Sequence, residues 1–142
     1  MATVRTAEAH WEGSLLEGQG EVELVSSGIG SFEVSWPSRA EAPNGKTSPE
    51  ELIAAAHSTC FSMSVALALT NAGNPPTSLD TQADVTFQPG QGITGIQLTV
   101  KGVVPDISAE QFEEAVREAE KSCPVSRALT GTTITVEGSL AE

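Results

Sequence analysis

The sequence predicts an α+β fold with antiparallel sheet, in a single domain that covers residues 1–142. Strand-like segments come first, then a long uncharged helix, two more strands, two helices and a last strand, and this grouping favours α+β over a doubly wound parallel sheet. The length of 142 residues, with 39% hydrophobic and 18% charged residues, fits one domain with its own core. No glycine-rich phosphate loop stands at a strand-to-helix junction, so nothing supports nucleotide binding.

The N-terminal part predicts a meander of three short strands over residues 4–13, 20–26 and 31–36, which are rich in β-forming residues and separated by glycines. In the second strand Gly20, Val22 and Leu24 share one face and Glu21 takes the other, which is typical of a half-buried strand. Residues 37–47, with two prolines and an Asn-Gly pair, predict a loop that carries Arg39.

A long helix is predicted to begin after Ser48, which serves as N-cap, with Pro49 at the first helical position and Glu51 completing a capping box. Apolar and small residues cover every side of residues 52–69, so we expect burial all round, with a partner subunit as the natural cover. The run is long enough to span a membrane, but His57 and several serines, threonines and alanines make it too polar for that. It ends at residues 71–73.

The rest of the chain predicts strands over residues 81–88 and 93–104, a helix, a short helix and a strand over residues 132–140. Ile96, Leu98 and Val100 alternate and should face the core. A capping box of Ser108 and Gln111 begins the helix that ends near Lys121, and its inner face is Phe112, Ala115, Val116 and Ala119. Cys123 followed by Pro124 is the pattern of an N-cap before a short helix.

The charge balance and the first residues bear on partners and compartment. With 7 basic and 19 acidic residues the net charge is −12, opposite to what binding to nucleic acid or to an anionic membrane surface requires. The first residues lack the apolar run of a secretory signal, so we expect a reducing cytoplasm. A structural disulfide is then not expected, and the two cysteines, Cys60 and Cys123, are either inert core residues or reactive ones.

Reactivity of either thiol depends on what stabilises its thiolate. Burial alone would keep Cys60 protonated, and between Arg5 and Lys101 the only cations are Arg39 and Lys46, both in the loop before the long helix. Glu50 at the start of that helix could hold an arginine through two parallel hydrogen bonds. Cys123 would gain from its position at a helix N-terminus. The residues alone leave open which cysteine attacks first.

Three alternatives explain the same residues differently. A cysteine hydrolase or acyltransferase would use His57, three residues before Cys60, as its base, although Cys123 then has no role. A zinc site could combine Cys60, His57 and Cys123. A non-catalytic binding dimer would use none of them chemically, with Cys60 a small core residue and His57 a core histidine that makes a backbone hydrogen bond.

Five segments, spread over nearly the whole chain, resemble one known family. They are HWEG (10–13), SRAE (38–41), SPEELIAAAHSTCFSM (48–63), PTSLDTQADV (76–85) and CPVSRAL (123–129). In this order they resemble the OsmC/Ohr family of thiol-dependent peroxidases that reduce organic hydroperoxides, and residues 55–57 favour its OsmC branch. The two segments that contain cysteine are the specific ones.

The resemblance implies a role for each candidate residue and a fold. Cys60 matches the peroxidatic cysteine, Cys123 the resolving cysteine, Arg39 the active-site arginine and Glu50 the carboxylate that orients it. The implied fold is an intertwined homodimer, with antiparallel sheets wrapped around long central helices and active sites at the dimer interface. The implied chemistry uses an organic hydroperoxide and a dithiol reductant such as a lipoylated protein, and needs no cofactor and no metal. An apolar pocket, with residues such as Leu52, Phe61 and Met63, would favour alkyl hydroperoxides.

Overall fold

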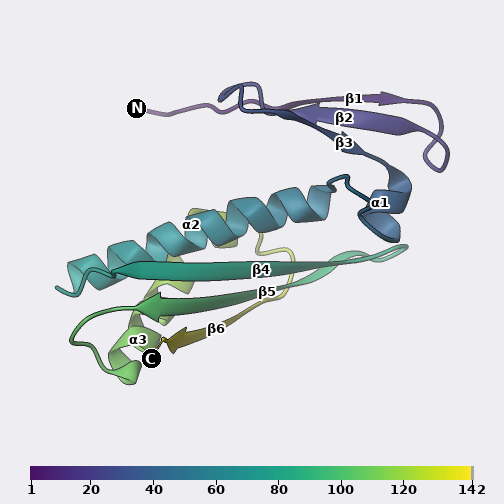
Figure 1. The fold of residues 1–142 in the computed structure, drawn as a ribbon. Helices are drawn as coiled ribbons and strands as arrows, with labels where there is room; N and C mark the ends of the chain where they lie inside the picture. Colours follow the sequence, from purple (N-terminus) through teal and green to yellow (C-terminus); the bar gives the residue numbers. More distant parts are fainter. Residues whose placement is uncertain (142) are drawn as a thin grey trace. The chain divides into compact units, whose positions relative to one another are not determined.

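The computed structural model describes residues 1–141, which form two compact units, Met1–Leu52 and the part that begins at Ile53. Both contain a three-stranded sheet, and the second also contains most of the helices (Figure 1). The predicted α+β composition is therefore confirmed, whereas the single domain over residues 1–142 stays a prediction.

The first unit contains the predicted meander, made of β1 (Glu8–Glu12), β2 (Gln19–Glu23) and β3 (Ser31–Val34). Both pairings are antiparallel, in the order β1-β2-β3. Gly20, Val22 and Leu24 are half-buried while Glu21 and Glu23 are exposed, as the alternation predicted. The strands are shorter than the predicted ranges.

The predicted loop after β3 was partly wrong, because it begins with a short helix, α1 (Trp36–Ala40). Ser35 caps it: the Ser35 hydroxyl accepts from the Ser38 N–H at 3.2 Å, and the Ser38 hydroxyl accepts from the Ser35 N–H at 3.0 Å. This reciprocal cap satisfies two N–H groups that a free helix start would leave open. Arg39 therefore lies on a helix rather than in a loop.

The long helix α2 (Pro49–Asn71) begins where the sequence predicted. The Ser48 hydroxyl accepts from the Glu51 N–H at 3.1 Å, while the Glu51 carboxylate accepts from the Thr47 hydroxyl at 2.6 Å instead of closing the expected box. Gly73, with φ +89°, ends the helix in a left-handed conformation that glycine adopts without strain.

The sheet of the second unit consists of β4 (Ser78–Gln88), β5 (Gly92–Val103) and β6 (Ile134–Leu140). β4 and β5 pair antiparallel across a short turn, but β6 pairs parallel to β5, so the expectation of purely antiparallel sheet was wrong. The reason is the connection: the helices between β5 and β6 carry the chain back across the sheet before β6 begins, and such a crossover returns it in the same direction.

Those connecting helices are α3 (Ala109–Ser122) and α4 (Pro124–Ala128). The capping box of α3 is confirmed, with the Ser108 hydroxyl accepting from the Gln111 N–H at 3.1 Å and the Gln111 side chain accepting from the Ser108 N–H at 2.9 Å. Cys123 is the N-cap of α4 and Pro124 its first residue, as predicted.

The core of the second unit lies between one face of its sheet and the helices. β5 contributes the predicted Ile96, Leu98 and Val100. The helices contribute a larger set of buried side chains: Phe61, Val65 and Leu69 from α2, and Phe112, Ala115, Val116 and Ala119 from α3. The inner face predicted for α3 is thus confirmed.

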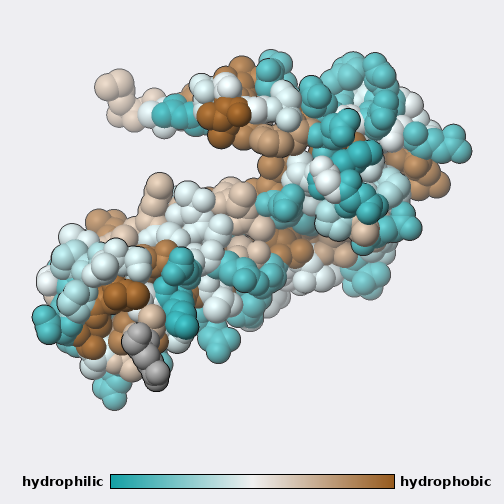
Figure 2. Space-filling model, viewed as in Figure 1, coloured by the Kyte–Doolittle hydropathy of each residue, from teal (hydrophilic) through white to brown (hydrophobic). Residues whose placement is uncertain are grey.

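The expected all-round burial of α2 is not found within this chain. Its buried positions in the second unit form one stripe at His57, Phe61, Val65 and Leu69, while Met63 and Leu67 are 68% and 61% exposed. By length and composition alone α2 could cross a membrane, but the core helix of a soluble protein meets the same two criteria. Large apolar side chains are exposed on both units, and Figure 2 shows such patches among polar residues.

Candidate active site

Cys60 lies in the middle of α2, one position before the buried Phe61, and is half-buried. It packs at the margin of the hydrophobic core of the second unit. Because α2 is helical throughout this stretch, the backbone around Cys60 is fixed and the position of its sulfur is set by packing.

Cys123 lies at the joint between α3 and α4, where it ends one helix and caps the next. Its side chain is completely buried. The Cys123 Sγ lies 3.5 Å from the Cys60 Sγ, although the two residues are far apart in the sequence. Both thiols are free. A disulfide has an S–S length of about 2.05 Å, so closing this pair requires an approach of only about 1.5 Å.

The surroundings act on the two thiols in opposite directions. Burial raises the pKa of the Cys60 thiol, and the neighbouring Cys123 thiol raises it further. Burial also raises the pKa of Cys123, but hydrogen bonds from the backbone N–H and the hydroxyl of Ser126 outweigh this, and the net effect lowers the Cys123 pKa. Within the second unit, Cys123 is therefore the thiol that ionises more readily.

Arg39 and Glu50, in the first unit, form the predicted pair. Arg39 Nε donates to both carboxylate oxygens of Glu50, at 3.0 and 3.2 Å, and Nη2 donates to Oε2 at 2.9 Å. The Glu50 side chain is 8% exposed and that of Arg39 is 32% exposed. A carboxylate that grips a guanidinium on two of its nitrogens fixes the direction in which the rest of the group points.

A pocket of about 440 Å³ in the first unit is bounded on one side by Arg39. Its walls are otherwise mostly apolar, and include Trp11, Leu15, Val22, Trp36, Pro49 and Leu52. Of the residues suggested for an apolar pocket, Leu52 lines this one, whereas Phe61 is a core residue of the second unit and Met63 is exposed. The pocket therefore combines a place for an alkyl chain with one fixed positive charge.

Each of the two predicted pairs is brought together within one unit. The thiols of Cys60 and Cys123 meet in the second unit, and Arg39 meets Glu50 in the first. Their roles in a reaction remain predictions. Lys46, the other cation considered, lines a different and more polar pocket beside β2 and β3.

His57 is completely buried, and its Nε2 lies 2.7 Å from the hydroxyl oxygen of Ser126 in α4. It is thus a core histidine, but its partner is a side chain and not the expected backbone group. This contact commits Nε2 to Ser126, which leaves the alternative of His57 as base for Cys60 without support from the geometry. Among residues 1–141, no three His, Cys, Asp or Glu side chains gather as a metal site requires.

Sequence reasoning missed Ser126. Its hydroxyl oxygen lies 2.7 Å from the His57 Nε2, and Ser126 contributes to lowering the pKa of the Cys123 thiol. The available signal was its place three residues after a predicted N-cap, since the third helical position lies next to the cap side chain. The contact with His57, which joins helices far apart in the chain, has no signal in a single sequence.

A comparison with protein families and a comparison with individual proteins relate this chain to the same group of proteins. A family model described as OsmC-like protein matches residues 42–137. The chain is 41% identical over 132 residues to the peroxiredoxin OsmC of Escherichia coli, covering 91% of this chain and 92% of that protein.

Two solved structures share the fold. One is an organic hydroperoxide resistance protein OsmC from Legionella pneumophila, with a TM-score of 0.72 and 22% identity, covering 99% of this chain and all of that one. The other is an organic hydroperoxide resistance protein from Elizabethkingia anophelis, with a TM-score of 0.70 and 25% identity, covering 100% of this chain and 99% of that one.

Proposed function

Because this chain belongs to the OsmC-like protein family, we propose that it is a thiol-dependent peroxidase that reduces organic hydroperoxides to alcohols. The single observation that carries the proposal is the 3.5 Å separation of the Cys60 and Cys123 sulfur atoms. Two free thiols at that distance need to approach by only about 1.5 Å to form a disulfide. The names of two relatives, peroxiredoxin and organic hydroperoxide resistance protein, support the same chemistry.

In the proposed first step the Cys60 thiolate attacks the terminal oxygen of the hydroperoxide. An S–O bond forms, the O–O bond breaks, and the alkoxide leaves and takes up a proton to become the alcohol. Cys60 becomes a sulfenic acid, so the sulfur loses two electrons and the peroxide gains them.

This step needs a positive charge beside Cys60, because burial raises the pKa of that thiol and favours its unreactive form. We propose that Arg39, oriented by Glu50, supplies this charge and also stabilises the departing alkoxide. Arg39 and Cys60 would then meet in the assembled homodimer. The apolar pocket next to Arg39 would receive the alkyl part of the substrate.

In the second step the Cys123 thiolate attacks the sulfenic sulfur of Cys60. The S–S bond forms, the S–O bond breaks, and the hydroxide that leaves is protonated to water. An external dithiol, for which we propose a lipoylated protein, then reduces the disulfide by exchange. A reducing cytoplasm would keep such a dithiol available.

The direct test treats the reduced protein, under anaerobic conditions, with one equivalent of an organic hydroperoxide such as cumene hydroperoxide. We expect the loss of both thiols, a decrease in intact mass by two hydrogen atoms and one equivalent of alcohol. A non-catalytic binding dimer would consume no hydroperoxide. Unchanged thiols together with unconsumed hydroperoxide would overturn the proposal.

A variant of Cys123 distinguishes the proposed peroxidase from the alternative of a hydrolase. Cys123→Ser should still react once with hydroperoxide, since Cys60 remains, but it should not be recycled by a dithiol through an intramolecular disulfide. A hydrolase or acyltransferase that depends on Cys60 and His57 would retain turnover of its ester substrates in this variant. Full dithiol-dependent peroxidase turnover in Cys123→Ser would contradict the assigned role of Cys123.

A further inference from the structure

His57 is a buried titratable group that the proposed mechanism does not use. Its ring is completely enclosed, Nε2 lies 2.7 Å from the Ser126 hydroxyl, and Nδ1 is a buried atom without a hydrogen-bond partner among residues 1–141. Because one ring nitrogen has a hydrogen-bond partner and the other has none, the contacts indicate which nitrogen carries the proton.

The geometry favours a neutral ring that carries its single proton on Nε2. Burial lowers the His57 pKa, so the charged form is disfavoured. A neutral ring has one N–H and one bare nitrogen, and an unpaired buried N–H is rarer in proteins than an unpaired acceptor. The partnerless Nδ1 is therefore the bare nitrogen, and the Nε2–H donates to the Ser126 oxygen.

This assignment turns the Ser126 hydroxyl hydrogen away from the His57 ring. The hydroxyl oxygen already accepts from His57, so its own hydrogen is available to donate elsewhere. Ser126 is the third residue of the helix that Cys123 caps, a position next to the cap side chain, so the Cys123 sulfur is the acceptor that this hydroxyl is placed to reach. A hydrogen bond there would complete a chain in which each group donates toward the sulfur: ring N–H to hydroxyl oxygen, and hydroxyl hydrogen to sulfur.

We propose that His57 and Ser126 are positioning residues for Cys123, in which the ring Nε2–H holds the Ser126 hydroxyl so that its hydrogen points at the Cys123 sulfur. The effect is to keep the resolving thiol ionised and its sulfur aimed at Cys60, which lies 3.5 Å away. Only the consequence for the resolving step rests on the proposed function; the hydrogen-bond chain itself does not.

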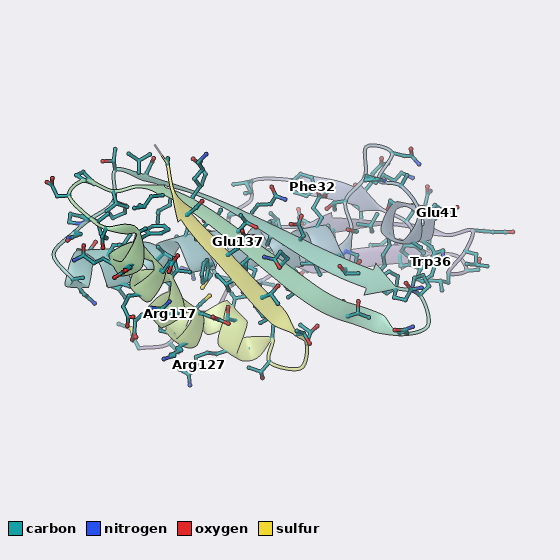
Figure 3. All side chains as sticks on the ribbon, turned by 90° about the horizontal axis from the view of Figure 1, so that it is seen from below. Phe32, Trp36, Glu41, Arg117, Arg127 and Glu137 are labelled. Carbon is teal, nitrogen blue, oxygen red and sulfur yellow. The ribbon has the colours of Figure 1, made fainter. Side chains whose placement is uncertain are left out.

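Among residues 53–141, His57 and Ser126 are the only buried polar or charged side chains, and the Cys60 thiol is the titratable group that the Cys123 sulfur contacts directly. The core side chains of α3 and β5 are apolar. The charged residues of α3 and α4, which include Glu118, Lys121 and Arg127, are exposed, and Figure 3 shows Arg127 extending away from the core.

The first test measures the ionisation of Cys123 without any peroxide. In a Cys60→Ser background Cys123 is the only thiol, and because the chain has no tyrosine, the rise of ultraviolet absorbance with pH reports that thiolate alone. Ser126→Ala should lower the thiolate fraction near neutral pH by about tenfold, since hydrogen bonds to charged groups are the stronger class. Ser126→Thr keeps the hydroxyl and should titrate like the parent.

A matched pair at His57 tests the other half of the chain. Gln places an amide N–H near the position of Nε2, whereas Leu has no donor, so His57→Leu should lower the thiolate fraction by about threefold and His57→Gln should not. Ser122→Ala is the control, because the exposed Ser122 hydroxyl donates to the Glu118 carbonyl and not to a thiol. Circular dichroism confirms that each variant is folded.

The second test follows the resolving step in the full chain with both cysteines. After one equivalent of cumene hydroperoxide, a dimedone trap should capture about tenfold more Cys60 sulfenic acid in Ser126→Ala than in the parent, and the excess should shrink as the pH rises. If no sulfenic acid or disulfide forms in any protein, the proposed function fails while the titration still decides the hydrogen-bond chain.

Two results would overturn the inference. One is a Ser126→Ala protein that is folded and titrates like the parent. The other is a His57→Leu protein that is folded and indistinguishable from His57→Gln, and this pair decides the matter if Ser126→Ala does not fold.

Discussion

Replacing Glu50 by Gln removes the charge that orients Arg39 while nearly preserving the volume of the side chain. The guanidinium then loses a bidentate partner that now accepts three hydrogen bonds of 2.9 to 3.2 Å. Removing one member of a buried ion pair costs about 3–5 kcal/mol, and an exposed pair contributes about 0–1 kcal/mol. Because Glu50 is buried but the Arg39 side chain is 32% exposed, water can solvate the arginine in part, and we expect a loss of about 2 kcal/mol.

The same variant should slow the reaction of Cys60 with hydroperoxide, because an arginine that is no longer held stabilises the thiolate and the departing alkoxide less well. We expect the second-order rate constant to fall by about 10- to 100-fold, less than the roughly 100- to 1000-fold cost of removing a charge-stabilising group, because the arginine itself remains. Urea unfolding measures the first effect, and stopped-flow oxidation of the reduced protein measures the second.

Glu51→Gln is the matched control, since Glu51 is the next residue, is exposed, and bonds to Thr47 rather than to an arginine. It should change the stability by under about 0.5 kcal/mol and leave the rate constant unaltered. An unchanged rate constant and stability in Glu50→Gln would refute the reasoning. So would equal losses in the two variants.

Three further predictions concern pH, packing and assembly. Burial lowers the pKa of His57 below its ordinary value of about 6.5, so the unfolded chain binds the proton more readily than the folded one. The free energy of unfolding should therefore be highest above about pH 7 and should fall as the pH drops below about 6.5. In urea titrations His57→Gln should remove this pH dependence, whereas His10→Gln, at an exposed position, should not. A Cβ at Gly102 would lie 2.7 Å from Phe112 and 3.0 Å from Leu79, so Gly102→Ala should lower the unfolding free energy by about 1–3 kcal/mol, whereas Gly131→Ala, with open space around it, should be nearly neutral. Leu67→Asp places a charge on the exposed apolar side of α2 and should convert the proposed homodimer to a monomer in sedimentation experiments, whereas the exposed Thr70→Asp near the helix end should weaken it less.

The parts of the fold that the sequence predicted are those that repeat along the chain. Alternation placed Ile96, Leu98 and Val100 in the core, and helical spacing placed Phe112 and Ala119 there, because each pattern is set by the geometry of one element. The direction of β6 could not be predicted in this way, since alternation reads the same in parallel and antiparallel strands. The helix α1 was missed because five residues show no periodicity and its start depends on two serines.

The candidate site also has parts that the sequence predicted and parts that it did not. The Arg39–Glu50 pair could be predicted because few cations lie near the long helix and Glu50 stands in its first turn. The contact between His57 and Ser126 joins residues 69 positions apart, and neither has a neighbour in the sequence that points to the other. Contacts of this kind depend on the packing of α4 against α2, which a single sequence does not encode in any local pattern.

The two thiols that meet in the second unit are 63 positions apart, and this separation has a thermodynamic consequence. A covalent link across a loop of that length restricts the denatured chain and, in the loop-entropy description, adds about 4 kcal/mol to the stability of the folded form. Each catalytic cycle would therefore alternate between a more easily melted reduced protein and a more heat-resistant oxidised one. The melting temperature of the protein would then report the fraction of molecules that peroxide has oxidised to the disulfide form.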